Sequence, residues 1–443
     1  MKLHLIIISI LLAQFSFAQE ISIKKLPKIW SLEDCITYAL KNNITVKDVA
    51  LNTKIAEVDY EKAKLSRLPD LFGNASQSFS NGNSIDPVTS DFVPDQTHST
   101  NIGINSSVTL FQGNRITNQI KQNSLLFEQS SYLEEAEKNN IVLTILETYL
   151  QTLYSKENIT IAENNLNASE KEVLRAKARL DAEEIALNDY TEAQSQAATN
   201  RYRLITAKNN YQQYIIALKQ LLELPPMEDL EIKTINENMN FVNLTLNKIE
   251  VYNKAINHLP EIEASKIGVA ISEKELDIVK SAYLPTLSLS GNIGSGYTSA
   301  MKNTFSNQFN VNFNQRVGLS LSVPIFNRNQ TSAAVKTTTI NIEKAEMQKY
   351  RTEKEIYKKI ETIYQNVLSA QEQVVAAEAS KVAAEQSYNL AQKKYELGDL
   401  STTDLVISQN TFTNAQQNYL QAKYLNILYY QLLQFYQGND IKL

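Results

Sequence analysis

The chain repeats itself at a distance of about 215 residues, and this duplication constrains its fold more than any other feature. Two stretches, IGINSSVTLF at 102–111 and VGLSLSVPIF at 317–326, alternate apolar and small polar residues in the same way. KLSRLPDL at 64–71 likewise matches KSAYLPTL at 280–287. A repeated unit of about half the chain predicts a pseudo-symmetric molecule and not two unrelated domains.

Long segments without glycine or proline separate the alternating stretches. They cover residues 114–224, 329–397 and 399–437. Because glycine and proline are the usual helix breakers, segments of this length predict long helices. We expect each half to follow one order: a helical segment, two strands, a helix of roughly 70 residues and a returning helix.

The boundaries follow from the breakers. The first helical segments are expected at 31–67, broken near Asn43, and at 246–283, broken at Pro260. The expected organisation is a signal peptide at 1–18, a first repeat at 19–224, a polar linker at 225–245 and a second repeat at 246–443. The β-hairpins are expected at about 70–111 and 286–326, and the coiled-coil hairpins at about 113–223 and 327–437.

Both long helices carry a heptad seam. Apolar and small residues recur with 3-4 spacing, which predicts a left-handed coiled-coil hairpin in each half. At about 1.5 Å per residue, a 70-residue helix is about 105 Å long, far longer than a globular domain needs. The seam residues are Ile159, Ala162, Leu166, Ser169, Val173, Ala176 and Leu180, then Val374, Ala377, Lys381, Ala384, Tyr388, Ala391 and Tyr395.

The N-terminus reads MKLHLIIISILLAQFSFAQ, with a basic Lys2, an apolar stretch and small residues at Ser16 and Ala18. This pattern predicts a secretory signal peptide that is cut after Ala18. No later segment is apolar over ~18 residues, so no transmembrane helix is expected. Cleavage removes Lys2 and leaves 42 of the 43 basic residues against 48 acidic ones, a net charge of −6 that argues against nucleic acid as a partner.

The alternating stretches have one apolar face and one small polar face. Apolar residues lie at 102, 104, 108 and 110, whereas Asn, Gly and Ser occupy 101, 103, 105 and 107. The alternative is a soluble antiparallel sheet with one face on a core. Such a sheet normally exposes Lys, Glu and Arg, but here the polar face carries Gly, Ser, Asn and Thr. Strands of ~9–11 residues with these two faces match a membrane β-barrel.

Four strands cannot close a barrel by themselves. In lipid, an open sheet edge leaves backbone groups unpaired at a cost of several kcal/mol each. The strands are therefore expected to be shared between chains, and three chains would supply twelve strands around an open lumen. The helices are too polar to cross a bilayer and are expected to continue away from it as a tube.

Several motifs resemble the TolC family of outer-membrane efflux proteins over essentially the whole mature chain. They are WSLEDCITYALKNN at 30–43, the Leu-Pro pairs at 68–69 and 284–285, SVTLF and SVPIF at the strand ends, and KKYELGDLSTTDLV at 393–406. The resemblance implies a mainly α fold with membrane β: a TolC-like homotrimer with a 12-stranded outer-membrane β-barrel stacked on a long periplasmic 12-helix α-barrel. It also implies docking, tips first, to a periplasmic adaptor and an inner-membrane transporter.

The resemblance further implies two functional regions. The adaptor-docking tips are Glu183, Glu184, Ile185, Ala186 and Leu187, and Leu397, Gly398, Asp399, Leu400, Ser401 and Thr402. Because Glu183 stands where the second half has Gly398, the first turn is expected to differ. Asp404 matches the first acidic ring of the periplasmic gate, and Asp189 is its counterpart, whereas Ile407 replaces the second ring. The alternative for Asp404 is a helix-end aspartate that favours the helix dipole.

No enzyme is expected. GNIGSG at 291–296 lies within a strand and is not followed by GK[ST], so it is not a phosphate loop. Cys35 is the only cysteine and is expected to be half-buried on a helix, and two scattered histidines remain after cleavage, so no metal or cofactor site is predicted. The favoured function is an export duct; a passive porin-like channel and a soluble periplasmic coiled-coil scaffold are the alternatives. The sequence does not identify the exported substrate.

Overall fold

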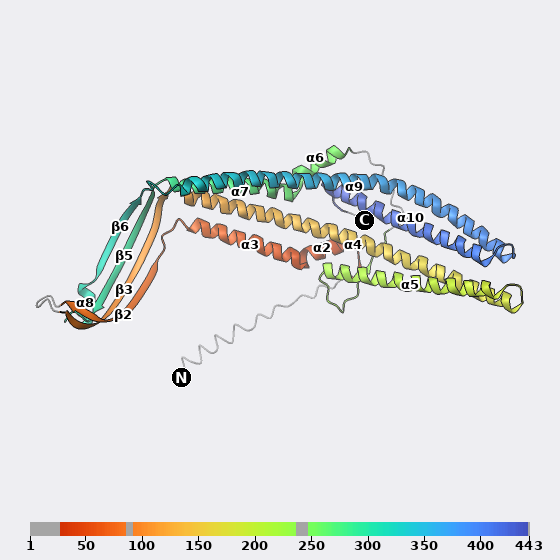
Figure 1. The fold of residues 1–443 in the computed structure, drawn as a ribbon, viewed down its shortest axis with the longest axis horizontal. Coiled ribbons are helices and arrows are strands. Elements are labelled where there is room, and N and C mark those ends of the chain that lie inside the picture. The colour runs from red at the N-terminus through yellow and green to blue at the C-terminus, as the bar shows by residue number, and fades with distance from the viewer. Residues whose placement is uncertain (1–26, 86–91, 236–246, 442–443) are drawn as a thin grey trace, which may run out of the picture.

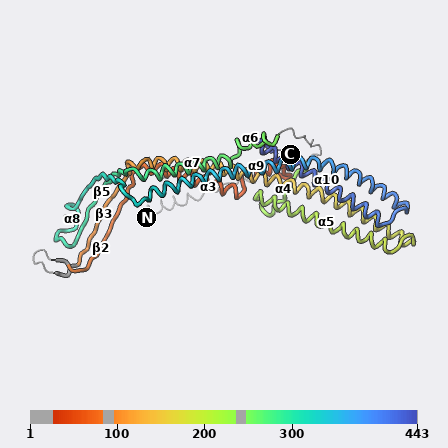
Figure 2. The backbone as a smooth tube through the Cα atoms, turned by 45° about the horizontal axis from the view of Figure 1, so that its top comes forward, coloured from red at the N-terminus to blue at the C-terminus, as the bar shows by residue number. Residues whose placement is uncertain are grey.

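The computed structural model describes residues 27–85, 92–235 and 247–441. A four-stranded sheet lies at one end of a long molecule, and helices run from it to two hairpin tips at the other end (Figures 1 and 2). The signal peptide expected at 1–18 and residues 236–245 of the expected linker lie outside the described residues. No described helix combines the length and the apolar composition that crossing a membrane requires.

The helices repeat with the displacements found in the sequence. A shift of 216 residues relates α2 (Leu32–Asn42) and α3 (Ile44–Leu65) to α6 (Lys248–His258) and α7 (Pro260–Lys280). A shift of 215 relates α4 (Arg115–Asp181) and α5 (Leu187–Leu221) to α9 (Gln330–Glu396) and α10 (Thr402–Tyr436). Both long helices have 67 residues and both returning helices have 35, so the internal duplication is confirmed.

Local sequence explains where the short helices begin. Ser31 and Asp34 form a capping box, in which Ser31 Oγ accepts from the Asp34 N–H at 3.2 Å and Asp34 Oδ2 accepts from the Ser31 N–H at 3.1 Å. Asn43 Oδ1 accepts from the Thr45 N–H at 2.9 Å at the start of α3. Pro260 is the first residue of α7, where its missing N–H costs nothing. The breaks expected near Asn43 and at Pro260 are confirmed.

The sheet is antiparallel in the order β2 (Phe72–Ile85), β3 (Phe92–Gln112), β5 (Thr286–Thr298) and β6 (Asn314–Ser322). Ile104 lies opposite Ile293, and Leu289 lies opposite both Val108 and Leu319, so the apolar residues share one face. A bulge after Thr109 shifts the register and sets Phe111 opposite Leu287.

The strands differ from expectation in three respects. β2 and β3 have 14 and 21 residues and extend past the apolar belt. β6 ends at Ser322, so Val323 and Ile325 do not continue the apolar face; Pro324 cannot donate to the ladder. The loop expected between β5 and β6 contains a helix, α8 (Phe305–Val311). The Gln308 side chain bonds both the N–H and the C=O of Thr298, at 3.0 and 2.9 Å, and so replaces a strand partner.

The largest core lies where α2, the last turns of α5 and the second half of α10 pack on the middle of α4. A parallel pair of two-residue strands, β1 (Ile29–Trp30) and β4 (Glu231–Ile232), lies beside it. Leu230 and Ile232 are buried there, so the segment expected to be a polar linker contributes to the core. Cys35 is fully buried, not half-buried as expected, and burial raises the pKa of its thiol to about 12.

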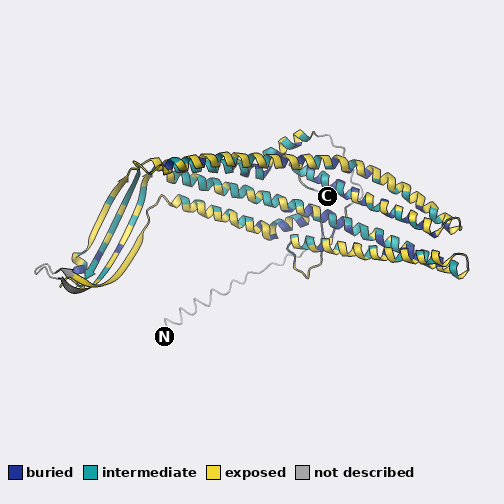
Figure 3. Ribbon diagram, viewed as in Figure 1, coloured by how far each residue is buried: buried dark blue, intermediate teal, exposed yellow. Residues whose placement is uncertain are grey.

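The heptad seams pack as the spacing predicts. Ala162, Ser169 and Ala176 are buried on α4, and Val374, Tyr388 and Tyr395 are buried on α9; the other seam residues are at least half-buried. Tyr388 stacks on Phe412 of α10, with ring centroids 5.7 Å apart. Figure 3 shows that buried and half-buried residues follow the lines along which the long helices touch, while their outer sides are exposed.

Candidate functional site

The two hairpin tips have the same turn. Glu183 has φ +60° and Gly398 has φ +83°, both in the left-handed region. The next N–H in each case bonds a carbonyl five residues back: Glu184 to Arg179 at 2.8 Å and Asp399 to Lys394 at 2.9 Å. The expectation that the first turn would differ is therefore wrong. The helix C-cap requires one left-handed residue, and Glu183 adopts this conformation although it costs a non-glycine residue about 1–2 kcal/mol.

Polar contacts join the two hairpins near the tips. Arg175 Nη2 lies 3.3 Å from Glu396 Oε1, and Arg179 Nη1 donates to the Tyr395 carbonyl at 3.5 Å. Thr403 Oγ1 donates to Glu192 Oε2 at 2.8 Å, which links α10 to α5. Sequence reasoning missed these partners, because each reads as an ordinary charged or polar residue on a helix surface. Only the packing of one repeat against the other brings them together.

Glu172 lies at the same junction. Its Oε1 is 2.8 Å from Arg175 Nη1, but its other carboxylate oxygen is buried without a hydrogen-bond partner. Burial raises the pKa of Glu172, and the Arg175 charge opposes that rise. A partly desolvated carboxylate next to the tips is a feature that the sequence did not reveal.

The two gate candidates lie in the first turns of their helices. Asp404 is exposed. Its Oδ2 accepts from Ser401 Oγ at 2.7 Å, and the Asp404 N–H donates to Ser401 Oγ at 3.1 Å. Asp189 is half-buried in the first turn of α5. Asp404 thus lies in the first turn of α10, as the helix-dipole alternative expects, and also takes part in the helix cap, while its charge stays at the surface. The contact between Thr403 and Glu192 links the first turn of α10 to the second turn of α5.

The apolar face of the sheet is exposed in a single chain. Val317 is 79% exposed and Leu319 is 65% exposed, and Ile102, Ile104 and Ile293 on neighbouring strands are also exposed. Patches of this kind on a soluble monomer mark a surface that contacts lipid or protein. Among the strands that the structure describes, β2 and β6 have no partner on their outer sides.

The opposite face of the sheet is polar and partly hollow. Asn292 Nδ2 donates to Asn105 Oδ1, and Asn105 Nδ2 donates to Asn74 Oδ1 at 2.7 Å. A chain of hydrogen bonds between side-chain amides therefore crosses three strands. A cavity of about 410 Å³ adjoins this row, lined mainly by asparagine, serine and glycine. An added Cβ at Gly296 would lie 2.5 Å from Asn101 Oδ1, so glycine keeps this face open.

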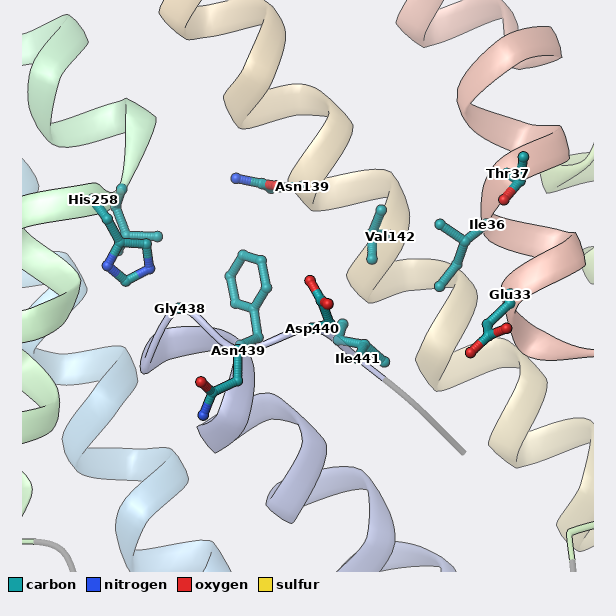
Figure 4. Close-up of a pocket in the computed structure, with 12 residues that line it drawn as sticks. Glu33, Ile36, Thr37, Asn139, Val142, His258, Gly438, Asn439, Asp440 and Ile441 are labelled. Atoms are coloured by element: carbon teal, nitrogen blue, oxygen red, sulfur yellow. The ribbon is translucent and has the colours of Figure 1, made fainter.

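A second cavity, of about 550 Å³, lies between the two repeats where α10 ends. His258 and Glu33 lie on opposite sides of it, with Asp440 between them (Figure 4). His258 Nδ1 is 2.7 Å from the Lys254 carbonyl oxygen. Within residues 27–85, 92–235 and 247–441, no three or more His, Cys, Asp or Glu side chains are placed to hold a metal ion.

The fold and its exposed apolar sheet define an outer-membrane channel protein with a long periplasmic helical extension. The family model described as "Outer membrane efflux protein" matches residues 35–223 and 251–435. The chain belongs to this family, the TolC family, whose members are transport proteins and not enzymes. This agrees with the fold, the localisation and the family that the sequence indicated.

Three similar proteins are distant from this chain in sequence. The chain is 22% identical to the outer membrane efflux protein BepC of Brucella suis over 72% of this chain and 65% of BepC. It is 22% identical to the outer membrane protein TolC of Vibrio cholerae over 56% of each chain. The match thus spans less than two-thirds of the length of these curated relatives. The crystal structure of CusC superimposes with a TM-score of 0.79 at 18% identity and covers 96% of both chains.

Proposed function

We propose that three copies of the chain form a closed tube that is the outer-membrane exit duct of a tripartite efflux or secretion system. Family members form trimeric channels of such systems. The observation that carries the proposal for this chain is its four-stranded sheet, which has an exposed apolar face and two unpaired edges. In lipid these edges must be paired, and joining β6 of one copy to β2 of the next pairs them all.

The helices support the same arrangement. α3 and α5 lie along one side of the chain and α9 along the other (Figure 1). Exposed apolar residues recur on α9 at multiples of seven, and others lie on α5; such stripes are unfilled coiled-coil seams. Two different sides that meet head to tail close into a ring when the rotation between neighbouring copies closes, and the proposed trimer is such a ring. The α9 stripe comprises Ile340, Met347, Leu368, Val375 and Val382, and the α5 residues are Tyr202, Ile205 and Ile216.

The tips are proposed to dock a periplasmic adaptor that joins the duct to an inner-membrane transporter. The tip residues lie at the end of the molecule farthest from the sheet (Figure 1), which is where a partner from the inner membrane would arrive. A photocrosslinking residue at Asp399 is expected to trap the adaptor. The same photocrosslinking amino acid in place of Lys302, beside the sheet, serves as the control and is expected to trap no adaptor.

Native mass spectrometry of the protein, extracted from outer membranes in mild detergent, tests the assembly. We expect a trimer that needs detergent to stay in solution. A monomer or dimer that is soluble without detergent would contradict the shared barrel, and with it the proposed duct.

A further inference from the structure

The polar face of the sheet carries a single basic side chain. Arg316 in β6 is the only Lys or Arg within the four strands that form the described sheet. Its backbone lies opposite Asn292 of β5, and Asn292 lies opposite Asn105 of β3. Residues that lie opposite each other in an antiparallel pair share a face, so Arg316 is on the same face as both asparagines. Its side chain is exposed.

The acidic residues of the sheet lie away from this arginine in the strand register. Asp95 is the only Asp or Glu within these four strands, and it lies ten residues along β3 from Asn105, about 34 Å away at the usual rise. Asp70 precedes β2, and its carboxylate accepts from the Ser107 N–H at 2.6 Å and from the Ser107 hydroxyl at 3.0 Å. Strand spacing puts Asp70 about 15 Å from Arg316 in the same chain. The Arg316 charge is therefore not compensated within its own sheet.

The surroundings of Arg316 suit an oxyanion. The amide chain from Asn292 through Asn105 to Asn74 supplies neutral polar groups beside Arg316. Asn292 and Asn105 lie at the level of Arg316, and Phe72 of β2 completes that row. The cavity of about 410 Å³ begins at Asn292 and Asn314, the second of which is two residues from Arg316. A guanidinium group presents its N–H donors in a fork that matches phosphate, sulfate and carboxylate oxygens.

We propose that the three copies of Arg316 form a basic ring in the barrel lumen that binds oxyanionic groups of passing solutes. The inference rests on the proposed trimer, in which the apolar face meets lipid and the polar face lines the lumen. Rings of Arg or Lys make pores selective for anions and phosphates. Walls of low dielectric constant strengthen the field of such a ring in the pore.

Current block in planar bilayers tests the ring. Inorganic tripolyphosphate is added to the barrel side of the full-length channel, so that it reaches Arg316 without passing the tips. We expect wild-type current to be blocked in 0.01 M KCl, where the Debye length is about 30 Å, and the block to be lost in 1 M KCl, where it is about 3 Å. Arg316→Gln is expected to weaken the block by about tenfold or more, and Arg316→Lys by less, because lysine keeps the charge without the fork.

Lys302→Gln is the matched control, since it removes the same charge from the turn after β5. This variant is expected to be blocked like the wild type. Equal block of wild type and Arg316→Gln would overturn the inference and leave the duct intact. A wild-type protein that forms no trimer would instead overturn the proposed function, and native mass spectrometry shows which of the two has failed.

One rival role for Arg316 is structural. In the closed barrel, β2 of the neighbouring copy follows β6, so Asp70 of that copy is a possible ion-pair partner. If Arg316→Gln and Asp70→Asn both lower the trimer fraction and neither changes the block, Arg316 joins the subunits and the anion ring is wrong. If Arg316→Gln weakens the block while the trimer stays whole, the ring is supported.

Discussion

At the scale of single residues, the duplication is visible in the backbone. The eight described residues with positive φ form four pairs that are each 215 residues apart. Both repeats adopt the left-handed backbone even where only one of them has glycine. Glu183 corresponds to Gly398, and Glu223 corresponds to Gly438. A helix end or a strand-to-helix junction therefore dictates these conformations, and the side chain follows. The remaining pairs are Gly113 with Arg328 and Asn114 with Asn329.

This leads to a prediction for the first tip. Glu183→Gly is expected to stabilise the hairpin end by about 0.5–1 kcal/mol, because glycine adopts a positive φ without strain but loses more entropy on folding. Hydrogen exchange at the neighbouring amides is expected to slow about two- to fivefold. Glu184→Gly is the control, since Glu184 is not a positive-φ residue, and its exchange is expected to be no slower than in the wild type. Equal slowing in both variants would contradict the backbone argument.

A second residue-scale prediction concerns the gate. Asp404→Ala is expected to raise ion conductance in planar bilayers about twofold or more, because it removes the network of three carboxylates that is proposed to hold the periplasmic mouth closed. The same change also removes a partner of the helix cap. Ser401→Ala therefore serves as the control: it removes the oxygen that accepts from the Asp404 N–H at 3.1 Å but keeps the charge. If both variants open the channel equally, the cap is responsible and the gate role of Asp404 is wrong.

At the scale of elements, each strand of the sheet has two chemically distinct faces. Adjacent residues of β6 illustrate this: Leu319 lies opposite Leu289 on the apolar face, and Ser320 lies opposite Ser288 on the polar face. Both are exposed in a single chain. The exposed fraction of a side chain in one chain therefore does not distinguish the two faces. In the proposed barrel they would differ, because one would contact lipid and the other would line the lumen.

Paired substitutions in β6 test this assignment. Leu319→Arg is expected to cost about 2–4 kcal/mol per chain if it faces lipid near the midplane, and to deplete the trimer in outer membranes. Ser320→Arg places the same side chain one residue away, on the lumen side, and is expected to assemble normally. The trimer recovered from outer membranes measures both. Equal tolerance of the two arginines would mean that this face does not meet lipid.

At the scale of the whole molecule, a single chain leaves sheet edges and apolar helix surface exposed. Within the described part of the chain, its sheet has two unpaired edges, and its α9 helix exposes apolar side chains at heptad spacing along the side where α3 and α5 of another copy would pack. These features fit the proposed ring of three chains. Stability of the protomer and assembly are therefore expected to be linked.

The α9 stripe provides a test at this scale. Val375→Asp is expected to weaken each subunit contact by about 2 kcal/mol or more, because it buries an unpaired charge in the proposed seam. Native mass spectrometry is expected to show dissociation at a concentration where the wild type is trimeric. Ser380→Asp, at an exposed position of α9 outside the stripe, is the control and is expected to remain trimeric. A trimeric Val375→Asp would show that this stripe is not a subunit contact.

The sequence by itself determined the duplication, the helix breaks at Asn43 and Pro260, the heptad seams and the two faces of the strands. Each of these depends on local spacing: 3.6 residues per helical turn, two per strand repeat, and the chemistry of capping residues. The tertiary structure alone decided that Gln308 of α8 completes the edge of β5, and that Leu230 and Ile232 fill a core. It also decided that Arg175 and Arg179 meet Glu396 and Tyr395 across the repeats. These contacts join residues that are far apart in the chain or depend on packing, so no local pattern encodes them.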